Sequence, residues 1–232
     1  MKINVNELHS SRVLMWSLLG IFIVVTLYAL GVRTLVPPDE GRYAEMAREM
    51  FVTGDWITTR LNGIKYFEKP PLQTWMNALT FAAFGLGEWQ ARLWTGLCGI
   101  IGVCMTAYAG KKVFGPRVGL YAGLVLASSL FWLASGQINS LDMGLSGMMT
   151  LTLGSLLIAQ RDDATAIERR NWMLLCWAAM ALAVLAKGLI GIVLPGAVLV
   201  LYSLCARDWR IWTRLHLVKG LLVFFAIAAP WF

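Results

Sequence analysis

The chain has 232 residues, of which 58% are hydrophobic and 14% are charged, whereas an ordinary soluble domain has about 25% charged residues. This composition excludes a soluble enzyme with a buried core. The formal net charge is +7. The basic residues lie in short segments between apolar runs, so we expect them to set membrane topology rather than to bind nucleic acid.

Seven apolar runs approach or reach the length of a membrane-spanning helix, which is about 20 residues. Together they predict an all-α, polytopic transmembrane protein with about seven spans. The first run is too long for the core of a signal peptide, so we interpret it as a retained span. The predicted spans are residues 14–33, 92–110, 117–136, 142–160, 171–186, 191–206 and 218–232.

If these spans alternate in direction, the short segments on one side carry twelve of the twenty Lys and Arg residues. The positive-inside rule assigns that side to the cytoplasm. The N-terminus is therefore predicted to be cytoplasmic, and segment 34–91 is predicted to lie outside. The twelve residues are Lys2, Arg12, Lys111, Lys112, Arg117, Arg161, Arg169, Arg170, Arg207, Arg210, Arg214 and Lys219.

The outer segment 34–91 is predicted to hold secondary structure of its own. In residues 40–51 apolar side chains recur at helical spacing with charges on the other faces, which predicts an amphipathic helix in the membrane interface. Residues 57–67 indicate a small β-hairpin, because Asn62-Gly63 supplies the positive φ angles that its turn needs. Residues 72–85 are apolar but short, so we expect a second interfacial or partly inserted helix.

The first span leads into Asp39 and Glu40, an acid pair where a membrane span meets water. Acids at a membrane edge are costly unless they have a partner or a function. Asp39 follows Pro38 at the start of the amphipathic helix, so it is either an N-cap or a catalytic carboxylate. Glu40 has the alternative of interacting with the positive end of the same helix.

Other polar residues lie at the predicted outer ends of the spans. Glu68 and Lys69 are either a functional pair or a solvated surface pair. Asp142 either caps the fourth span or takes part in chemistry. Lys187 either extends to the membrane interface or joins the same site.

A transferase on the outer side has no access to cytosolic nucleotides, so it needs an activated donor that crosses the membrane. A sugar attached to a lipid phosphate carrier meets this need. The chemistry then requires a carboxylate to act as base on the acceptor. It also requires cations, with or without a metal, to balance the departing phosphate, and an apolar groove for the lipid tail.

Five stretches of the chain together resemble the bacterial ArnT-type glycosyltransferases. These are grouped with the protein O-mannosyltransferases in the GT-C superfamily, in glycosyltransferase families 39 and 83. The similarity lies in both the order and the spacing of the stretches. They are Asp39-Glu40-Gly41-Arg42-Tyr43-Ala44-Glu45, Gly54-Asp55-Trp56, Tyr66-Phe67-Glu68-Lys69-Pro70-Pro71-Leu72, Ser140-Leu141-Asp142 and Ala186-Lys187-Gly188.

The resemblance implies inverting transfer of a sugar from a polyprenyl-phosphate carrier to an outer-side acceptor. In the ArnT type the sugar is 4-amino-4-deoxy-L-arabinose and the acceptor is lipid A. The implied partners are the lipid-linked donor, lipid A or another glycan or protein acceptor, and membrane lipids. The implied location is the bacterial inner membrane, with the active site in the periplasm.

The same resemblance assigns roles to individual residues. Asp39 is the catalytic acid/base residue beside the acceptor, and Asp142 is a second active-site acid near the sugar. Glu68 matches a position that contacts metal in some members, so a divalent metal is the implied cofactor. Glu40 and Tyr43 belong to the first motif. The donor phosphate is bound by Lys69, Tyr66, Arg42 and Lys187.

The resemblance also implies that residues 1–232 are the N-terminal part of a GT-C transmembrane catalytic module. Residues 34–91 are its first periplasmic loop, and the further spans and the soluble periplasmic domain are expected to be absent from this chain. Two other classes stay open, a transporter or flippase and a non-catalytic membrane assembly subunit. Few ionisable residues lie near the middle of the predicted spans, which favours surface chemistry over transport.

Overall fold

The computed structural model describes residues 12–232, which form eleven helices and one two-stranded hairpin. Residues 1–11, with Lys2 of the basic set, lie outside this described part. The elements are α1 (Arg12–Ala29), α2 (Asp39–Thr53), β1 (Arg60–Leu61), β2 (Ile64–Lys65), α3 (Leu72–Phe84), α4 (Glu88–Phe114), α5 (Pro116–Ser128), α6 (Leu130–Gly136), α7 (Leu141–Ala159), α8 (Ala166–Lys187), α9 (Ile190–Ala206), α10 (Arg210–Thr213) and α11 (Leu217–Ala228).

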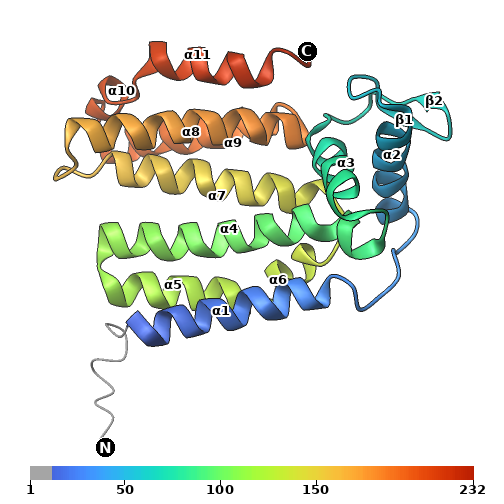
Figure 1. Ribbon diagram of the computed structural model, residues 1–232. Helices are drawn as coiled ribbons and strands as arrows, with labels where there is room; N and C mark the ends of the chain where they lie inside the picture. Colours follow the sequence, from blue (N-terminus) through green and yellow to red (C-terminus); the bar gives the residue numbers. More distant parts are fainter. Residues whose placement is uncertain (1–11) are drawn as a thin grey trace, which may run out of the picture.

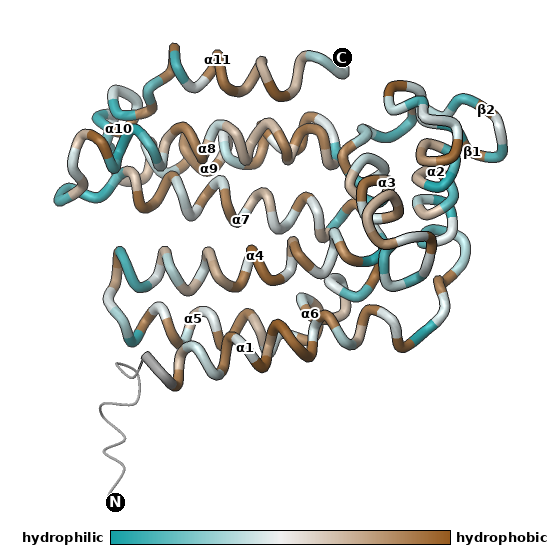
Figure 2. The backbone as a smooth tube through the Cα atoms, in the orientation of Figure 1, coloured by the Kyte–Doolittle hydropathy of each residue, from teal (hydrophilic) through white to brown (hydrophobic). Residues whose placement is uncertain are grey.

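The long helices lie side by side, whereas α2, α3 and the hairpin gather at one end of the bundle (Figure 1). Figure 2 shows hydrophobic residues along the long helices and hydrophilic residues concentrated towards the two ends. Helices that cross a bilayer need this distribution, because their middle sections face hydrocarbon. The predicted all-α, polytopic membrane architecture is confirmed.

Two helices, α4 and α7, are long and apolar enough to cross a membrane by themselves. The pair α5 and α6 passes the same test when both helices are taken together. Helix α8 covers the predicted span 171–186. The shorter apolar helices are Leu14–Ala29, Ile190–Ala206 and Leu217–Ala228. Each predicted span therefore corresponds to helical structure in the described part of the chain.

The prediction of one continuous span over residues 117–136 is wrong. Ser129 has an extended backbone conformation between α5 and α6, and the two helices differ in direction by 64°. Ser128 Oγ donates a hydrogen bond to the carbonyl of Val125. Serine side chains compete in this way with the backbone ladder, which explains why a helix breaks at a Ser-Ser pair.

Several predicted span boundaries are also corrected. Helix α1 ends at Ala29 rather than at residue 33, and α11 ends at Ala228 rather than at residue 232. Helix α8 begins five residues before the predicted position 171, at Ala166. Thr165 and Glu168 form a capping box there, each side chain bonding to the other residue's backbone N–H. This sequence signature defines a helix start before the apolar run begins.

The predicted elements of segment 34–91 are confirmed. Helix α2 covers the amphipathic stretch and buries Tyr43, Met46 and Met50. The hairpin is antiparallel, and its turn residues Asn62 and Gly63 have φ angles of 54° and 75°. Helix α3 covers the second short apolar stretch and packs against α2 through a shared apolar cluster.

The basic connections between the long helices share the end of the bundle opposite α2 and α3 (Figure 1). Arg214 pairs with Asp162 at 3.2 Å and donates to the carbonyl of Gln160, so it joins the α10 region to the α7–α8 connection. The polar chemistry of segment 34–91 and this basic set therefore lie at opposite ends of the helices.

The bundle core lies between α4, α7 and α8. Trp94 and Cys98 of α4 are buried against Met143 of α7. A Cβ atom added at Gly147 would lie 2.8 Å from the carbonyl oxygen of Cys98. Glycine at this position therefore lets α4 and α7 approach closely, and a larger residue would push them apart. Small residues commonly have this role where helices pack within membranes. This packing fixes the first turn of α7 at the end of the bundle near α2.

Candidate active site

Asp39 is an exposed acid at the start of α2. Pro38 occupies the N-cap position and Asp39 lies one residue inside the helix, so the N-cap interpretation of Asp39 is wrong. Its side chain is 67% exposed, and Arg42 on the next turn lies 3.5 Å away. An exposed carboxylate held by one long ion pair is available to a ligand.

The segment after the hairpin contributes a second set of charged groups. The hydroxyl of Tyr66 donates to Glu68 at 2.7 Å, and Lys69 Nζ lies 2.8 Å from the same carboxylate. Lys69 and then Tyr66 lower the pKa of Glu68, and Glu68 raises the pKa of Lys69. Glu68 and Lys69 are therefore both charged near neutral pH. They are a surface ion pair, as one of the two interpretations expected, and this does not exclude a functional role.

Tyr43 connects these groups. Its side chain is buried, and burial raises the pKa of the phenol; the charge on Asp39 raises it further, whereas Lys69 and Arg42 lower it. The interaction with Tyr66 raises the pKa of Arg42. Tyr43 therefore interacts electrostatically with Asp39, Arg42, Tyr66 and Lys69. The structure gathers most of the predicted site residues into one cluster, which we call the Asp39 cluster: Asp39, Arg42, Tyr43, Tyr66, Glu68 and Lys69.

The remaining predicted pair lies at the same end of the bundle. Lys187, at the end of α8, forms an ion pair with Asp142 in the first turn of α7. Ser140 is the N-cap of α7, so the interpretation of Asp142 as that cap is wrong. Leu141, the residue before this acid, packs in the same buried cluster as Tyr43. The Asp142–Lys187 pair therefore adjoins the Asp39 cluster across a shared apolar contact.

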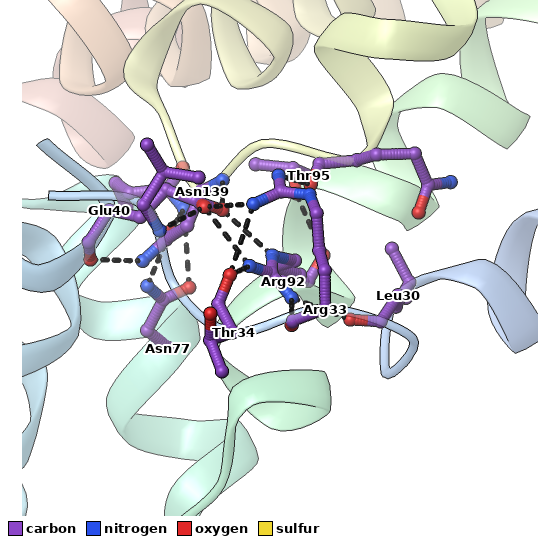
Figure 3. Close-up of polar contacts among 11 residues, drawn as sticks. Leu30, Arg33, Thr34, Glu40, Asn77, Arg92, Thr95 and Asn139 are labelled. Carbon is purple, nitrogen blue, oxygen red and sulfur yellow. Dashed lines mark hydrogen bonds and ion pairs between the residues drawn. The ribbon is translucent and has the colours of Figure 1, made fainter.

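Glu40 has a different environment from the one expected. Its carboxylate is 1% exposed, so its interpretation as an acid that only interacts with the helix dipole is wrong. Arg92 donates to both carboxylate oxygens, from Nε at 2.7 Å and from Nη2 at 3.0 Å (Figure 3). Arg33 donates to it at 2.7 Å, and the backbone N–H groups of Val36 and Asn139 each donate at 2.8 Å.

Arg92 extends this network beyond Glu40. Its guanidinium is fully buried and also donates to the carbonyls of Leu30, Arg33 and Thr34. These carbonyls follow the end of α1, and their hydrogen bonds to a side chain explain why that helix stops short of the prediction. One arginine thus joins α4 to the α1–α2 connection.

Asn139 attaches two further elements to the network. Its side-chain oxygen accepts from Gln73 at 2.7 Å and from Asn77 at 2.9 Å, both on α3. Its side-chain nitrogen donates to the backbone carbonyl of Glu40 at 3.2 Å (Figure 3). The network therefore fixes α2 relative to α1, α3, α4 and the segment before α7, directly beside Asp39.

Burial opposes ionisation of Glu40, but its hydrogen bonds outweigh burial. The bonds from Arg92, Arg33, Asn139 and Val36 together lower its pKa to about 2. Glu40 is therefore ionised near neutral pH and has no free lone pair facing solvent. We interpret it as a structural residue that positions the start of α2.

Sequence reasoning identified the exposed residues and missed Arg33, Arg92 and Asn139. A signal for Arg92 was present, because a charged residue in the first turn of an apolar run is costly without a partner. The partner, Glu40, lies 52 positions away in the sequence. Only the fold shows that these two residues meet.

No group of three His, Cys, Asp or Glu side chains that could hold a metal ion occurs within residues 12–232. Glu68 offers one carboxylate, which Lys69 and Tyr66 already engage. The described residues therefore do not supply a metal-ligand set around Glu68.

Fold and site together define a polytopic helical membrane protein with an acid-and-cation cluster at one end of its bundle. Residues 68–232 match the sequence family described as dolichyl-phosphate-mannose-protein mannosyltransferase, and the chain belongs to this family. Its architecture is of the GT-C type.

One curated relative is the undecaprenyl phosphate-alpha-4-amino-4-deoxy-L-arabinose arabinosyl transferase of Shewanella sediminis. It is 32% identical over 224 residues, which are 90% of this chain and 38% of that protein. The chain thus spans about two fifths of the length of the curated relatives that it matches.

Solved structures show the same arrangement of helices. ArnT from Cupriavidus metallidurans in the apo state has a TM-score of 0.91 and 47% identity, over 95% of this chain and 42% of that one. The structure of the same protein bound to undecaprenyl phosphate also has a TM-score of 0.91. The Archaeoglobus fulgidus oligosaccharyltransferase, at 14% identity and a TM-score of 0.70, shares the fold over 95% of this chain and 30% of that one.

Proposed function

We propose that the protein carrying this chain transfers a sugar from a polyprenyl-phosphate carrier to an acceptor at the end of the bundle that holds the Asp39 cluster. The observation that carries this proposal is the exposed Asp39 carboxylate, which pairs with Arg42 and shares the neighbour Tyr43 with Tyr66 and Lys69, at the edge of an apolar bundle. An acid next to phosphate-binding cations is the set of groups that this reaction needs.

The acceptor oxygen attacks C1 of the donor sugar from the face opposite the carrier phosphate. The new C1–O bond forms as the bond between C1 and the phosphate oxygen breaks, and the electron pair stays on the phosphate. The proton of the acceptor hydroxyl or phosphate passes to Asp39. Lys69, with Arg42 and Tyr66, balances the charge that develops on the leaving phosphate.

Asp142 and Lys187 complete the proposed site. Both side chains are exposed at the same end of the bundle. Asp142 is proposed to lie near the sugar, and Lys187 is proposed to orient Asp142 and to add positive charge towards the phosphate. A divalent metal at Glu68 would add charge neutralisation, but it would need ligands beyond those that residues 12–232 supply. No step above depends on it.

The names of the relatives suggest the substrates. They favour undecaprenyl phosphate as carrier and 4-amino-4-deoxy-L-arabinose as sugar. The proposed acceptor is lipid A, with another glycan or a protein as alternatives. The basic end of the bundle supports a topology with the N-terminus in the cytoplasm of a bacterial inner membrane and the Asp39 cluster in the periplasm.

The direct test uses the purified full-length protein with a polyprenyl-phosphate-linked sugar and an acceptor lipid. Mass spectrometry should detect glycosylated acceptor together with free polyprenyl phosphate. Asp162→Asn, at the opposite end of the bundle, is the matched control and should keep full turnover. Movement of intact donor across the membrane without transfer would instead identify a flippase, and neither event would favour an assembly subunit.

The topology has its own test. The exposed Cys205 is first replaced by Ser, since Cys98 and Cys176 are buried and Cys104 is half-buried. A cysteine then introduced at position 39 should react with a membrane-impermeant reagent added from the periplasmic side. Labelling only from the cytoplasmic side would overturn the proposed orientation.

A further inference from the structure

A hollow with a mixed polar and apolar wall borders Asp39. A cavity of about 370 Å³ opens between the α1–α2 connection and the end of α6. Its wall includes Asp39, Arg33, Val36, Ala134 and Ile138. The donor-binding residues proposed above lie outside this wall, so Asp39 borders two separate regions. We call this hollow the Arg33 cavity.

The ion-pair group formed by Arg33, Glu40 and Arg92 beside the cavity carries a net positive charge. Glu40 contributes one negative charge, which two arginines share. Arg92 is fully buried, whereas the side chain of Arg33 is 37% exposed. The uncompensated positive charge of the three groups is therefore presented at Arg33.

The guanidinium of Arg33 is held in a fixed position, but not all of its N–H donors have a protein acceptor within residues 12–232. One terminal nitrogen donates to Glu40 and the other donates to the carbonyl of Gln137, each at 2.7 Å. Within residues 12–232, its Nε donates to no protein acceptor. A third bond runs from Arg33 to the backbone carbonyl of Thr34 at 3.2 Å. A guanidinium that is anchored by three bonds and keeps a free donor can bind an anion at low entropic cost.

Part of the cavity wall is apolar. Val36 and Ile138 are exposed, and so is Ala134 on α6. Leu130 lies one helical turn before Ala134 on the same face, and Leu130 and Phe131 are each 82% exposed. The apolar surface therefore continues from the cavity along α6, which belongs to a broken membrane span.

We propose that the Arg33 cavity binds the acceptor, an amphiphile with an anionic headgroup, and that Arg33 recognises its charge. Complementary charge and a continuous apolar wall beside one cation fit such a lipid. Arg33 binds the anion, the wall beside α6 contacts the first part of the chains, and an acceptor oxygen reaches Asp39. Donor and acceptor then approach Asp39 from two sides, as displacement at C1 requires. This inference rests on the proposed function.

Ala134→Trp tests the cavity without changing any ion pair. It fills the hollow from an exposed position, and Ala166→Trp, exposed at the far end of the bundle, is its control. In full-length protein, Ala134→Trp should raise the KM for an anionic acceptor lipid at least tenfold and leave the donor KM within about twofold. Ala166→Trp should change neither value.

Arg33→Gln and Arg33→Lys test the recognition of charge. Arg33→Gln should raise the acceptor KM about tenfold and should reduce the preference for a phosphorylated lipid over its uncharged counterpart. Arg33→Lys keeps the positive charge, so its acceptor KM and its preference for the phosphorylated lipid should lie between those of Arg33→Gln and wild type. An unchanged acceptor KM in Ala134→Trp and Arg33→Gln, or an equal rise in donor KM, would overturn the inference and leave the transferase function intact.

A binding measurement separates this inference from the proposed function. Phosphatidic acid is titrated into wild-type protein without donor, and diacylglycerol with the same acyl chains serves as the uncharged probe. Wild-type protein should bind phosphatidic acid more tightly than diacylglycerol, and Ala134→Trp should weaken phosphatidic acid about tenfold. Equal binding of both lipids, or equal binding by both proteins, refutes the cavity assignment even if no transfer is detected.

Discussion

Asp39 and Glu40 are neighbours in the sequence but lie in opposite environments. Asp39 is exposed and has one long ion pair, whereas Glu40 is buried and accepts hydrogen bonds from four residues. A fully bonded carboxylate cannot take a proton from a substrate without losing those bonds. The pair therefore divides two tasks, because Glu40 holds the backbone in place and Asp39 is left free for a ligand.

The largest expected effect on stability comes from removing the buried partner of Glu40. Arg92→Met leaves a buried carboxylate without its bidentate partner, so the free energy of unfolding should fall by about 3–5 kcal/mol. Chemical unfolding of the purified protein in detergent measures this change. Arg48→Met breaks an exposed pair with Glu45 and should lower stability by less than about 1 kcal/mol. If both variants lower the free energy of unfolding equally, the buried Glu40 network contributes no more to stability than an exposed ion pair.

The exposed region should instead respond in ligand binding. Lys69→Met removes one cation from the proposed phosphate site, so the Kd for polyprenyl phosphate should rise about 10- to 100-fold, as expected for a hydrogen bond to a charged group. Lys65→Met, on the exposed strand β2 nearby, should leave that Kd unchanged. If both variants bind the lipid equally well, Lys69 is not a phosphate ligand.

The loss of stability at acid pH should depend on Glu40. Its pKa in the folded protein is about 2, below the ordinary value of 4.5. The stabilising contribution of this carboxylate is therefore complete above about pH 4.5 and is lost as the pH falls towards 2. Glu40→Gln should be less stable than wild type at neutral pH, and its stability should fall less over this acid range. If the free energy of unfolding falls equally with pH in both proteins, Glu40 does not cause the acid sensitivity.

Only a small effect on stability is expected at the Asp142–Lys187 pair. Both side chains are exposed, so Lys187→Met should change the free energy of unfolding by less than about 1 kcal/mol. Its transfer rate should nevertheless fall, because the pair belongs to the proposed site. A stability loss as large as that of Arg92→Met would mean that this pair is structural.

Local features of the fold could be predicted from the sequence because each has a short-range physical cause. The turn at Asn62-Gly63 follows from residues that tolerate positive φ, and α2 follows from apolar residues at helical spacing. The break at Ser129 and the early start of α8 at Thr165 were missed, because hydropathy alone does not register a serine side chain that bonds to the backbone.

The residues of the Asp39 cluster could be predicted from the sequence, but the partners of the buried Glu40 could not. Asp39 and Lys69 stand out in the sequence because each lies beside a proline at a membrane edge. The meeting of Glu40 with Arg92 and Asn139 depends on how α2, α4 and the segment before α7 pack together. No local pattern encodes such contacts, since their partners are separated by tens of residues.

The division of tasks between the two neighbouring acids is tested most directly by Asp39→Asn in the full-length protein. The measurement pairs the rate of sugar transfer with the unfolding midpoint of the same preparation. The rate should fall by about 10²- to 10⁴-fold, the usual contribution of a general base, and the midpoint should not change. A variant that transfers sugar at nearly the wild-type rate, or one that loses activity only because it unfolds, would contradict the account.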